Sequence, residues 1–288
     1  MTDLLLGAIV SGLMLGGFYA AVTLGLTMVF GYLNIVNIAH PAFVILGSYL
    51  TFAVNSQWGL DPIVAGVMLT PLFFALGVAV HAIYHASFEA READSLRGLA
   101  FFFGLMFIIE VGLILQFGVD YRLVGAPYIG ATIDFFSVIV PLRMLFPFLV
   151  AVALVTVLHL FLTRTFFGRA IRAVSQDSIA LQLVAIDPVK VKRVAFGIAM
   201  ATACIAGALL IIIGPVEPSV GRGYIGRVFA IVVLGGMGSV VGTLGAALLL
   251  GLAESLTSTF YGPSWAPAVV FGFLLVALAA RPSGLVSR

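Results

Sequence analysis

Charged residues are scarce in this sequence. Only 9% of its 288 residues are Asp, Glu, Lys or Arg, and 62% are hydrophobic, whereas a typical soluble domain carries roughly 25% charged residues. So little charge cannot cover a water-facing surface, which indicates that most of the surface faces lipid. The net charge of +2 gives no reason to expect a nucleic-acid partner. The single cysteine, Cys204, excludes an internal disulfide and is expected to be a small packing residue.

Motifs for covalent chemistry and nucleotide binding are also missing. The sequence has no Gly-Lys-Ser/Thr, Gly-x-Ser-x-Gly or His-Glu-x-x-His, so neither a phosphate-binding P-loop nor a common hydrolase site is predicted. His81 and His85 are four residues apart, but no cluster of Cys or acidic residues accompanies them, and we predict no metal site. We expect no enzyme activity and no cofactor bound by this chain. If a transport cycle uses ATP and Mg²⁺, another chain must bind them.

Long apolar runs are what the sequence has in abundance. A membrane-spanning helix needs about 20 mostly apolar residues, and these runs are too long and uniform for barrel strands. The pattern predicts an all-α integral membrane protein with about eight hydrophobic segments in a single domain over residues 1–288. The first run is too long for a signal peptide and is expected to be a permanent span. The segments lie near residues 4–30, 38–54, 63–85, 98–118, 142–163, 194–213, 228–259 and 265–280.

Basic residues predict the orientation of these segments. Segment 163–193 is rich in Lys and Arg, and such segments usually remain in the cytoplasm. Counting the crossings backwards then puts the N-terminus on the outer, periplasmic side. The tail with Arg281 and Arg288 is expected to be cytoplasmic. The basic residues of 163–193 are Arg164, Arg169, Arg172, Lys190, Lys192 and Arg193, against Asp177 and Asp187.

The apolar run 228–259 is too long for one span and is interrupted at 234–245. A re-entrant hairpin explains the interruption: 226–236 enter the membrane as a half-helix and 240–259 return to the same side. Because 163–193 and the C-terminal tail are both expected in the cytoplasm, the chain between them must cross the membrane an even number of times, and the hairpin makes the count even. Irregular backbone at membrane depth occurs where protein or water satisfies it, often at a transport pathway. Alternatively, Gly238, Gly242 and Ala246 form only a small-residue packing face. The candidate pathway residues of the turn are Gly235, Gly236, Gly238 and Ser239.

The stretch GYLNIVNIAHPAF, residues 31–43, places polar side chains between two apolar runs. Pro41 removes a backbone donor and disfavours helix at the preceding residues. We therefore predict a helix break near one membrane face, where Asn34, Asn37 and His40 satisfy the freed backbone groups and line a water-accessible path. The alternative is a set of interfacial turn residues that contact no ligand.

Two acidic residues, Glu110 and Glu254, lie inside apolar runs. Acids at membrane depth are costly and usually face the interior of the bundle or water. We favour pairing with an internal arginine or hydroxyl group. The other possibility is a proton relay, in which case the chain would be a stand-alone secondary transporter.

Segment 168–193 has a helical pattern within a predicted cytoplasmic loop. Residues 168–176 and 178–186 are expected to form two short helices, with capping side chains from Ser175 to Asp177, and Asp187-Pro188 starts the next helix. This pattern favours a protein-docking surface over an ordinary positive loop. Four apolar residues are expected to pack as a stripe while three polar ones face water. The stripe is Ile171, Val174, Leu181 and Val184, and the polar residues are Arg169, Arg172 and Gln182.

Three stretches, residues 23–50, 168–193 and 229–256, resemble the H-type membrane permeases of branched-chain amino acid ABC importers. The resemblance implies a bacterial inner-membrane subunit that pairs with a second, M-type permease, two ATPase subunits and a periplasmic solute-binding protein. Segment 168–193 is similar to the loop that couples such permeases to their ATPases. Its candidate docking residues are Arg169, Arg172, Asp177, Asp187 and Lys190.

Two residues depart from the family pattern. Pro41 stands where relatives usually have Gly after the histidine, and Ala185 stands where Gly usually precedes the Ile-Asp pair. The resemblance implies transport of a small polar solute, which is a branched-chain or other amino acid, urea or an amide. Whether the two permeases of the complex are identical or different is left open by the sequence.

Overall fold

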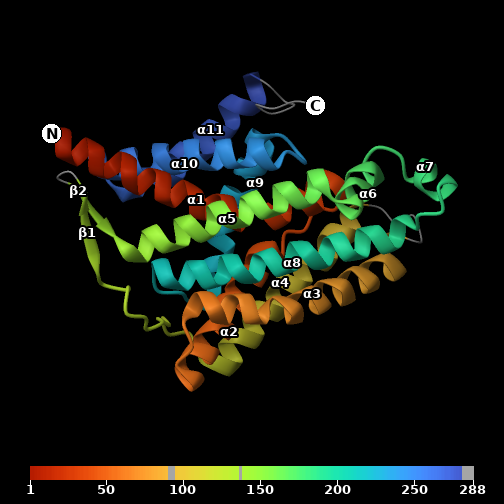
Figure 1. Ribbon diagram of the computed structural model, residues 1–288, viewed down its shortest axis with the longest axis horizontal. Helices are drawn as coiled ribbons and strands as arrows, with labels where there is room; N and C mark the ends of the chain where they lie inside the picture. The colour runs from red at the N-terminus through yellow and green to blue at the C-terminus, as the bar shows by residue number, and fades with distance from the viewer. Residues whose placement is uncertain (90–94, 136–137, 281–288) are drawn as a thin grey trace.

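Long helices make up almost all of the protein in the computed structural model (Figure 1), which describes residues 1–89, 95–135 and 138–280. Six helices in this part of the chain are long and apolar enough to cross a membrane, which confirms the all-α membrane fold. The six are α1 (Thr2–Leu33), α3 (Pro62–Ser87), α4 (Ser95–Phe117), α5 (Leu142–Arg164), α8 (Pro188–Ile213) and α10 (Val240–Phe260). The shorter helices are α2 (His40–Trp58), α6 (Phe166–Val174), α7 (Ser178–Leu183), α9 (Gly221–Gly235) and α11 (Ala266–Ala280).

Helices α1 and α8 form the centre of the bundle. α8 packs against α1, α2 and α3, while α1 also packs against α5 and α10. In the apolar stretch of α8, 78% of the residues are buried, against 28% in α3, α4 and α5. The outer helices therefore keep apolar surface for lipid, and α8 is surrounded by protein. Cys204 of α8 is fully buried, in agreement with a packing role.

Small residues allow α1 and α10 to pack closely. A Cβ atom at Gly16 of α1 would lie 2.6 Å from Cα of Leu248, and one at Gly251 of α10 would overlap the backbone of Gly16. In lipid, helices associate through such close contacts because apolar surface gains nothing by leaving hydrocarbon. The glycines therefore fix the position of α10 against α1.

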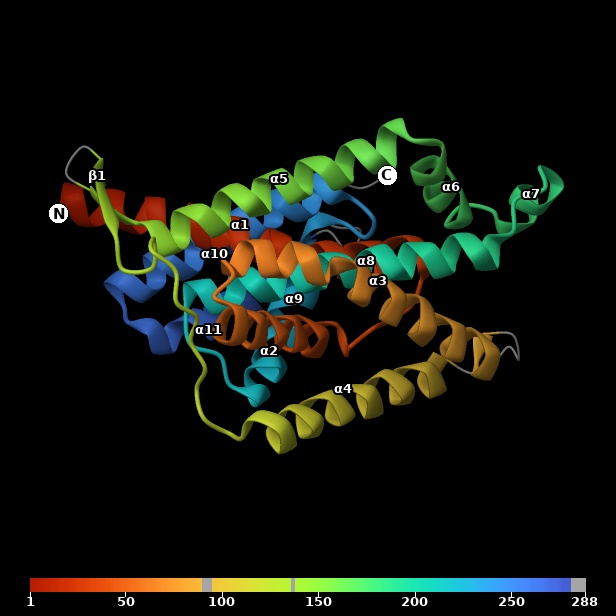
Figure 2. The ribbon, with the colours of Figure 1, turned by 60° about the horizontal axis from the view of Figure 1, so that its bottom comes forward.

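Helix α4 lies at the periphery of the bundle and stands apart from the central helices in Figure 2. It packs mainly against α2. Large side chains spaced by three or four positions lie on its buried face, together with Gly98, as expected for a helix with one protein-facing side. They are Phe102, Met106, Glu110 and Leu113. Glu110 is thus on the face of α4 that contacts the rest of the protein.

Two irregular segments lie at the end of the bundle that carries the N-terminus (Figure 1). Strands β1 (Thr132–Phe135) and β2 (Val138–Pro141) form an antiparallel hairpin, which the sequence pattern did not predict. Arg122 and Val216 exchange backbone hydrogen bonds of 2.9 and 3.0 Å, which join the segments that follow α4 and α8. The short 3₁₀-helix η2 (Pro218–Val220) then leads into α9, and a second one, η3 (Pro263–Trp265), precedes α11.

The predicted break in the run 228–259 is present between α9 and α10. The first of the two helices begins at Gly221, five residues earlier than expected, and has 15 residues against 21 in α10. The turn between them lies against the last turn of α1, close to α6, at the end of the bundle opposite the N-terminus (Figure 1). Arg281 and Arg288, on which the predicted orientation of the tail depended, lie outside the described residues.

Glycine-to-alanine substitutions at two positions of α10 should show how much the close contact with α1 contributes to stability, apart from the higher helix propensity of alanine. Gly251→Ala forces a methyl group into the backbone of α1, and overpacking of this kind costs about 1–3 kcal/mol. Gly245→Ala is the matched control, since no atom lies within 4 Å of the position that its Cβ would occupy, and it should be neutral or stabilising. Thermal denaturation in detergent measures both changes. Equal melting temperatures for the two variants would contradict the close α1–α10 contact.

Candidate functional site

Two helix breaks meet at the end of the bundle opposite the N-terminus. α1 ends at Leu33, and Asn34 then adopts a left-handed conformation with φ of 56°. The chain continues without regular structure until α2 begins at His40. A Cβ atom at Gly31, in the last turn of α1, would overlap the backbone of Gly238 in the α9–α10 turn. The predicted breaks are therefore in direct backbone contact.

The α9–α10 turn depends on glycine at several positions. Gly236 and Gly238 have φ of 88° and 80°, which other residues rarely adopt. A Cβ atom at Gly235 would lie 2.6 Å from Cα of Thr243. The hydroxyl of Ser239 accepts a hydrogen bond of 3.0 Å from the backbone N–H of Gly242 and so caps α10. Close packing and a helix break thus occur together at this turn; its role in a pathway stays a prediction.

The polar residues of the first break are divided between the surface and the interior. Asn34 is exposed, whereas Asn37 and His40 are fully buried. The side-chain oxygen of Asn37 accepts a 3.1 Å hydrogen bond from the N–H of Ala39. His40 donates from Nε2 to the carbonyl oxygen of Val22, 2.9 Å away in the middle of α1. Asn37 therefore satisfies a backbone group at the break, whereas His40 does not and instead ties the start of α2 to an inner turn of α1.

Both membrane-embedded acids have the partners that the sequence led us to favour. Glu254 accepts a 2.7 Å hydrogen bond from the hydroxyl of Tyr19 and pairs with Arg227 at 3.0 Å. Glu110 pairs with Arg222. Both arginines come from α9 and were missed at the sequence level. The sequence that could have identified them is GRGYIGRVF at 221–229, where two arginines stand just before an apolar run.

Helices α6 and α7 project from the bundle at the end opposite the N-terminus (Figures 1 and 2). Asp177 caps α7 by accepting from the N–H groups of Ile179 and Ala180 at 2.8 and 3.0 Å. Asp187 caps α8 through Val189 and Lys190 at 2.9 and 3.4 Å. Both caps match the sequence pattern. They hold the short helices in a defined geometry outside the bundle.

The expected apolar stripe of this segment is only partly correct. Ile171, Val174 and Leu181 are buried, but Val184 is 65% exposed. Val184 follows the last residue of α7, so it no longer continues the helical face of Leu181. The exposed apolar residues of α7 and its end are Ile179, Leu183 and Val184, at 69%, 84% and 65%.

The charged residues predicted for docking differ in exposure. Arg169, Asp177, Asp187 and Lys190 are exposed, and Lys190 lies 3.8 Å from Asp187. Arg172 was expected to face water but is only partly exposed. It lines a cavity of about 150 Å³ together with residues of α1, α5 and the α9–α10 turn. The cavity residues include Tyr32, His159, Thr163, Gly238 and Ser239.

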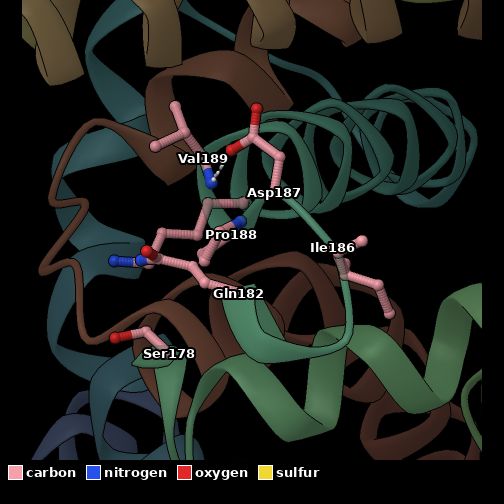
Figure 3. Close-up of a pocket in the computed structure, with 8 residues that line it drawn as sticks. Ser178, Gln182, Ile186, Asp187, Pro188 and Val189 are labelled. Carbon is pink, nitrogen blue, oxygen red and sulfur yellow. Dashed lines mark hydrogen bonds between the residues drawn. The ribbon is translucent and has the colours of Figure 1, made fainter. Parts of the chain in front are cut away.

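A larger cavity of about 570 Å³ lies between α7 and the start of α8 (Figure 3). Its lining includes Ser178, Gln182 and Lys192, and Figure 3 shows Asp187 directed at the N–H of Val189. Lys192 also pairs with Glu89, which follows α3, and His85 lies 2.8 Å from the same carboxylate. Burial alone would raise the pKa of Glu89, but the hydrogen bonds from Lys192 and His85 outweigh it and lower this pKa. The carboxylate thus ties the end of α3 to the start of α8.

Comparison with known proteins identifies the family of this chain. Residues 8–279 match the family described as the permease component of branched-chain amino acid transport systems. The chain belongs to this permease family. It is 29% identical to the high-affinity branched-chain amino acid transport permease protein BraD of Pseudomonas aeruginosa, over 97% of this chain and 95% of the relative. It is 28% identical to LivH of Escherichia coli K12 over 96% and 94%. No solved structure matches the chain.

A permease protein of Escherichia coli K12 with a different name, LivM, is also similar to this chain. The identity is 31%, over 93% of this chain and 67% of the relative. Its membrane-spanning helices and its permease relatives, LivH and LivM among them, show that this chain is a multi-pass membrane protein. The resemblance noted from residues 23–50, 168–193 and 229–256 is confirmed over nearly the whole chain.

The two departures from the family pattern have different structural consequences. Pro41 lies in the first turn of α2, where the ring's fixed φ is suited to a helix start and its missing N–H costs nothing. Ala185 adopts φ of 60° directly after α7, in the left-handed region that glycine occupies without strain. The first departure fits the local structure, and the second one strains it.

Restoring glycine at position 185 should stabilise the end of α7. Ala185→Gly removes a left-handed strain of about 1–2 kcal/mol, less the roughly 0.5–1 kcal/mol that glycine loses in conformational entropy. Ala180→Gly, in the interior of α7, is the control and should destabilise the helix by about 1 kcal/mol. Hydrogen exchange of the amides of α7 reports both. Faster exchange in Ala185→Gly than in the unchanged permease would show that the strain is not there.

Proposed function

We propose that this permease is a membrane subunit of an ATP-driven importer that moves a small polar solute, such as a branched-chain amino acid, across the bacterial inner membrane. The observation that carries the proposal is a family match over residues 8–279 together with a capped helical segment, α6–α7, that exposes apolar side chains outside the bundle. Relatives at 28–29% identity are named as permeases of branched-chain amino acid transport systems. Nothing in the described residues requires covalent chemistry.

The complex we infer contains a second permease of the M type, two ATPase subunits and a periplasmic solute-binding protein. Similarity to both LivH and LivM supports packing of two related permeases against each other. ATP and Mg²⁺ are bound by the ATPases, because this chain has no P-loop sequence. The excess of basic residues at 163–193 directs α6 and α7 to the cytoplasm and the N-terminus to the periplasm.

Docking of the ATPases uses α7 and its flanking charges. Ile179 and Leu183 expose apolar surface at 69% and 84%, which a binding partner would cover. Arg169, Asp177, Asp187 and Lys190 supply the surrounding charges that steer and orient the partner. Arg172 is less exposed and extends instead toward the turn at Gly238 and Ser239 through the cavity that they share.

Movement of α6 can therefore reach the helix breaks through the cavity that Arg172 and the α9–α10 turn share. Closure of the ATPases shifts α6 and α7, and Arg172 transmits the shift to the α9–α10 turn. That turn contacts Gly31 beside Asn34, Asn37 and His40. In this mechanism the binding protein delivers solute at the periplasmic end, and displacement of the two breaks opens the path to the cytoplasm.

A stand-alone secondary transporter is the second candidate. It would use Glu110 or Glu254 to relay protons. Both carboxylates are instead paired with arginines of α9, Glu110 with Arg222 and Glu254 with Arg227. The pairs therefore support a structural role for these acids.

Purification of the tagged permease from its native membrane, followed by mass spectrometry of the associated proteins, tests the assembly. The importer predicts co-purification of an ATPase, a second permease and, with solute present, a binding protein. Uptake by proteoliposomes should then require ATP. Uptake by the isolated permease without ATP would establish the secondary transporter instead.

The double variant Ile179→Asp/Leu183→Asp should lose the ATPase while retaining the second permease, because it places charge on the apolar docking surface of α7. The substitutions remove the apolar contact of α7 with the ATPase and bury two carboxylates in that interface. We expect them to weaken ATPase binding by about 100-fold or more. Gln176→Asp adds a charge to an exposed position of the same segment and should leave the complex intact. Recovery of stoichiometric ATPase with the double variant would refute docking on α7.

A further inference from the structure

The interior of the chain is closely filled. Thr27 of α1, Asn37 of the α1–α2 link, His40 and Ser48 of α2 and Thr243 of α10 are each 0% exposed. The first and last of these hydroxyls lie 3.1 Å apart across the α1–α10 contact. Since these polar groups face one another and not an open space, the path considered for a solute is the surface of this chain that would face the second permease of the proposed complex.

Arg222 identifies which surface this is. Its side chain is 52% exposed although it pairs with Glu110, which lies seven residues before the end of α4 at Phe117. Seven helical residues correspond to about 10 Å along the axis, so the pair lies well inside the apolar part of the outer half of the bundle. Exposure of a guanidinium to hydrocarbon is strongly unfavourable. The exposed side of Arg222 consequently faces water or another protein rather than lipid.

Arg227, one and a half turns further along α9, is in a different environment. It is 25% exposed and pairs with the buried carboxylate of Glu254. Its guanidinium also lies over the ring of Tyr224 at 5.7 Å. The contacts of Arg227 hold α9 against α10 and α1. Arg222 is held from the side of α4, by Glu110 and by the ring of Phe107 at 5.8 Å.

We propose that Arg222 lies on the solute path at the interface with the second permease and binds the carboxylate of the transported solute. A guanidinium has five N–H donors, and Glu110 occupies one of its nitrogens, Nη2. The remaining donors match a carboxylate in a two-point contact.

The charge of Glu110 makes this contact weak enough for transport. Because the pair is neutral overall, an arriving carboxylate binds the free donors of a guanidinium whose charge Glu110 already balances, and it does not meet an uncompensated positive charge. The inference rests on the proposed function and narrows it: amino acids have the required carboxylate, whereas urea and simple amides do not.

Cysteine labelling tests the position of Arg222 independently of transport. In the assembled complex with Cys204→Ser in this chain, Arg222→Cys should react with a membrane-impermeant thiol reagent, since a thiol needs water to ionise. Ile108→Cys is the control at the same depth of α4, where the native side chain is 70% exposed and faces lipid. Equal lack of reaction at the two positions would overturn the proposal.

Uptake measurements test the role of the charge. Arg222→Met should lower ATP-driven leucine uptake by about tenfold or more, the effect of losing one charge-assisted contact, without loss of subunits. Arg143→Met, an exposed arginine at the start of α5, should have no effect. Reaction of Arg222→Cys with an aminoethyl thiol reagent, which restores a positive charge, should recover uptake, and reaction with a neutral methyl reagent should not.

A double variant separates solute binding from simple charge balance. If Arg222 only neutralises Glu110, then Glu110→Gln/Arg222→Met removes both charges and restores uptake, and the proposal is wrong. If Arg222 binds the solute, the double variant stays as deficient as Arg222→Met. A complex that shows no ATP-dependent uptake of any amino acid even without substitutions would contradict the proposed function in the form used here. The labelling of Arg222→Cys and Ile108→Cys would still decide whether α9 faces a water-accessible path.

Discussion

The backbone contact between the end of α1 and the α9–α10 turn is the constraint on which the other features depend. Each of these places is a helix break, and a break leaves N–H and C=O groups that lipid cannot satisfy. The chain satisfies them locally, through the caps at Asn37 and Ser239, and then packs the two breaks together. That packing requires glycine at Gly31, because any Cβ atom would overlap Gly238. The contact between the two breaks is thus specified by the sequence through this glycine.

Helix α9 connects this contact to the opposite part of the molecule. Near its start, Arg222 and Arg227 hold it to α4 and to α10 through Glu110 and Glu254. At its end, Gly235 leads into the turn, which shares a cavity with Arg172 of α6. In the importer that we propose, one 15-residue helix therefore joins the surface that meets the solute to the segment that meets the ATPase.

Features that depend on neighbouring residues could be predicted from the sequence, and features that depend on distant ones could not. The caps at Asp177 and Asp187 and the break after Leu33 follow from local rules of helix termination. The partner of Glu110 is 112 residues away in the chain, and no periodicity indicates which arginine it meets. Val184 was placed on a buried stripe because a longer α7 was expected, and the earlier end of the helix turned it to the surface.

Similarity to relatives identifies the family of the chain, but it does not predict the local structure at the positions where the chain departs from the family pattern. The family pattern has glycine where Pro41 stands, which suggested an altered break, yet proline fits the first turn of α2. Conversely, the departure at Ala185 has a local cost because that position requires a positive φ. The same kind of departure thus has opposite consequences at two positions, and only the backbone conformation distinguishes them.

In the proposed mechanism, α6 and the α9–α10 turn move as one body when the ATPases bind ATP. Pulsed electron resonance on the assembled complex can measure this with spin labels at Arg169 of α6 and at Met237 of the turn, both exposed, and with a reference pair at Arg169 and Leu115 of α4. We expect the 169–237 distance to stay the same between the ATP-free and ATP-bound states while the 169–115 distance changes. A change in 169–237 as large as that in 169–115 would contradict this mechanism.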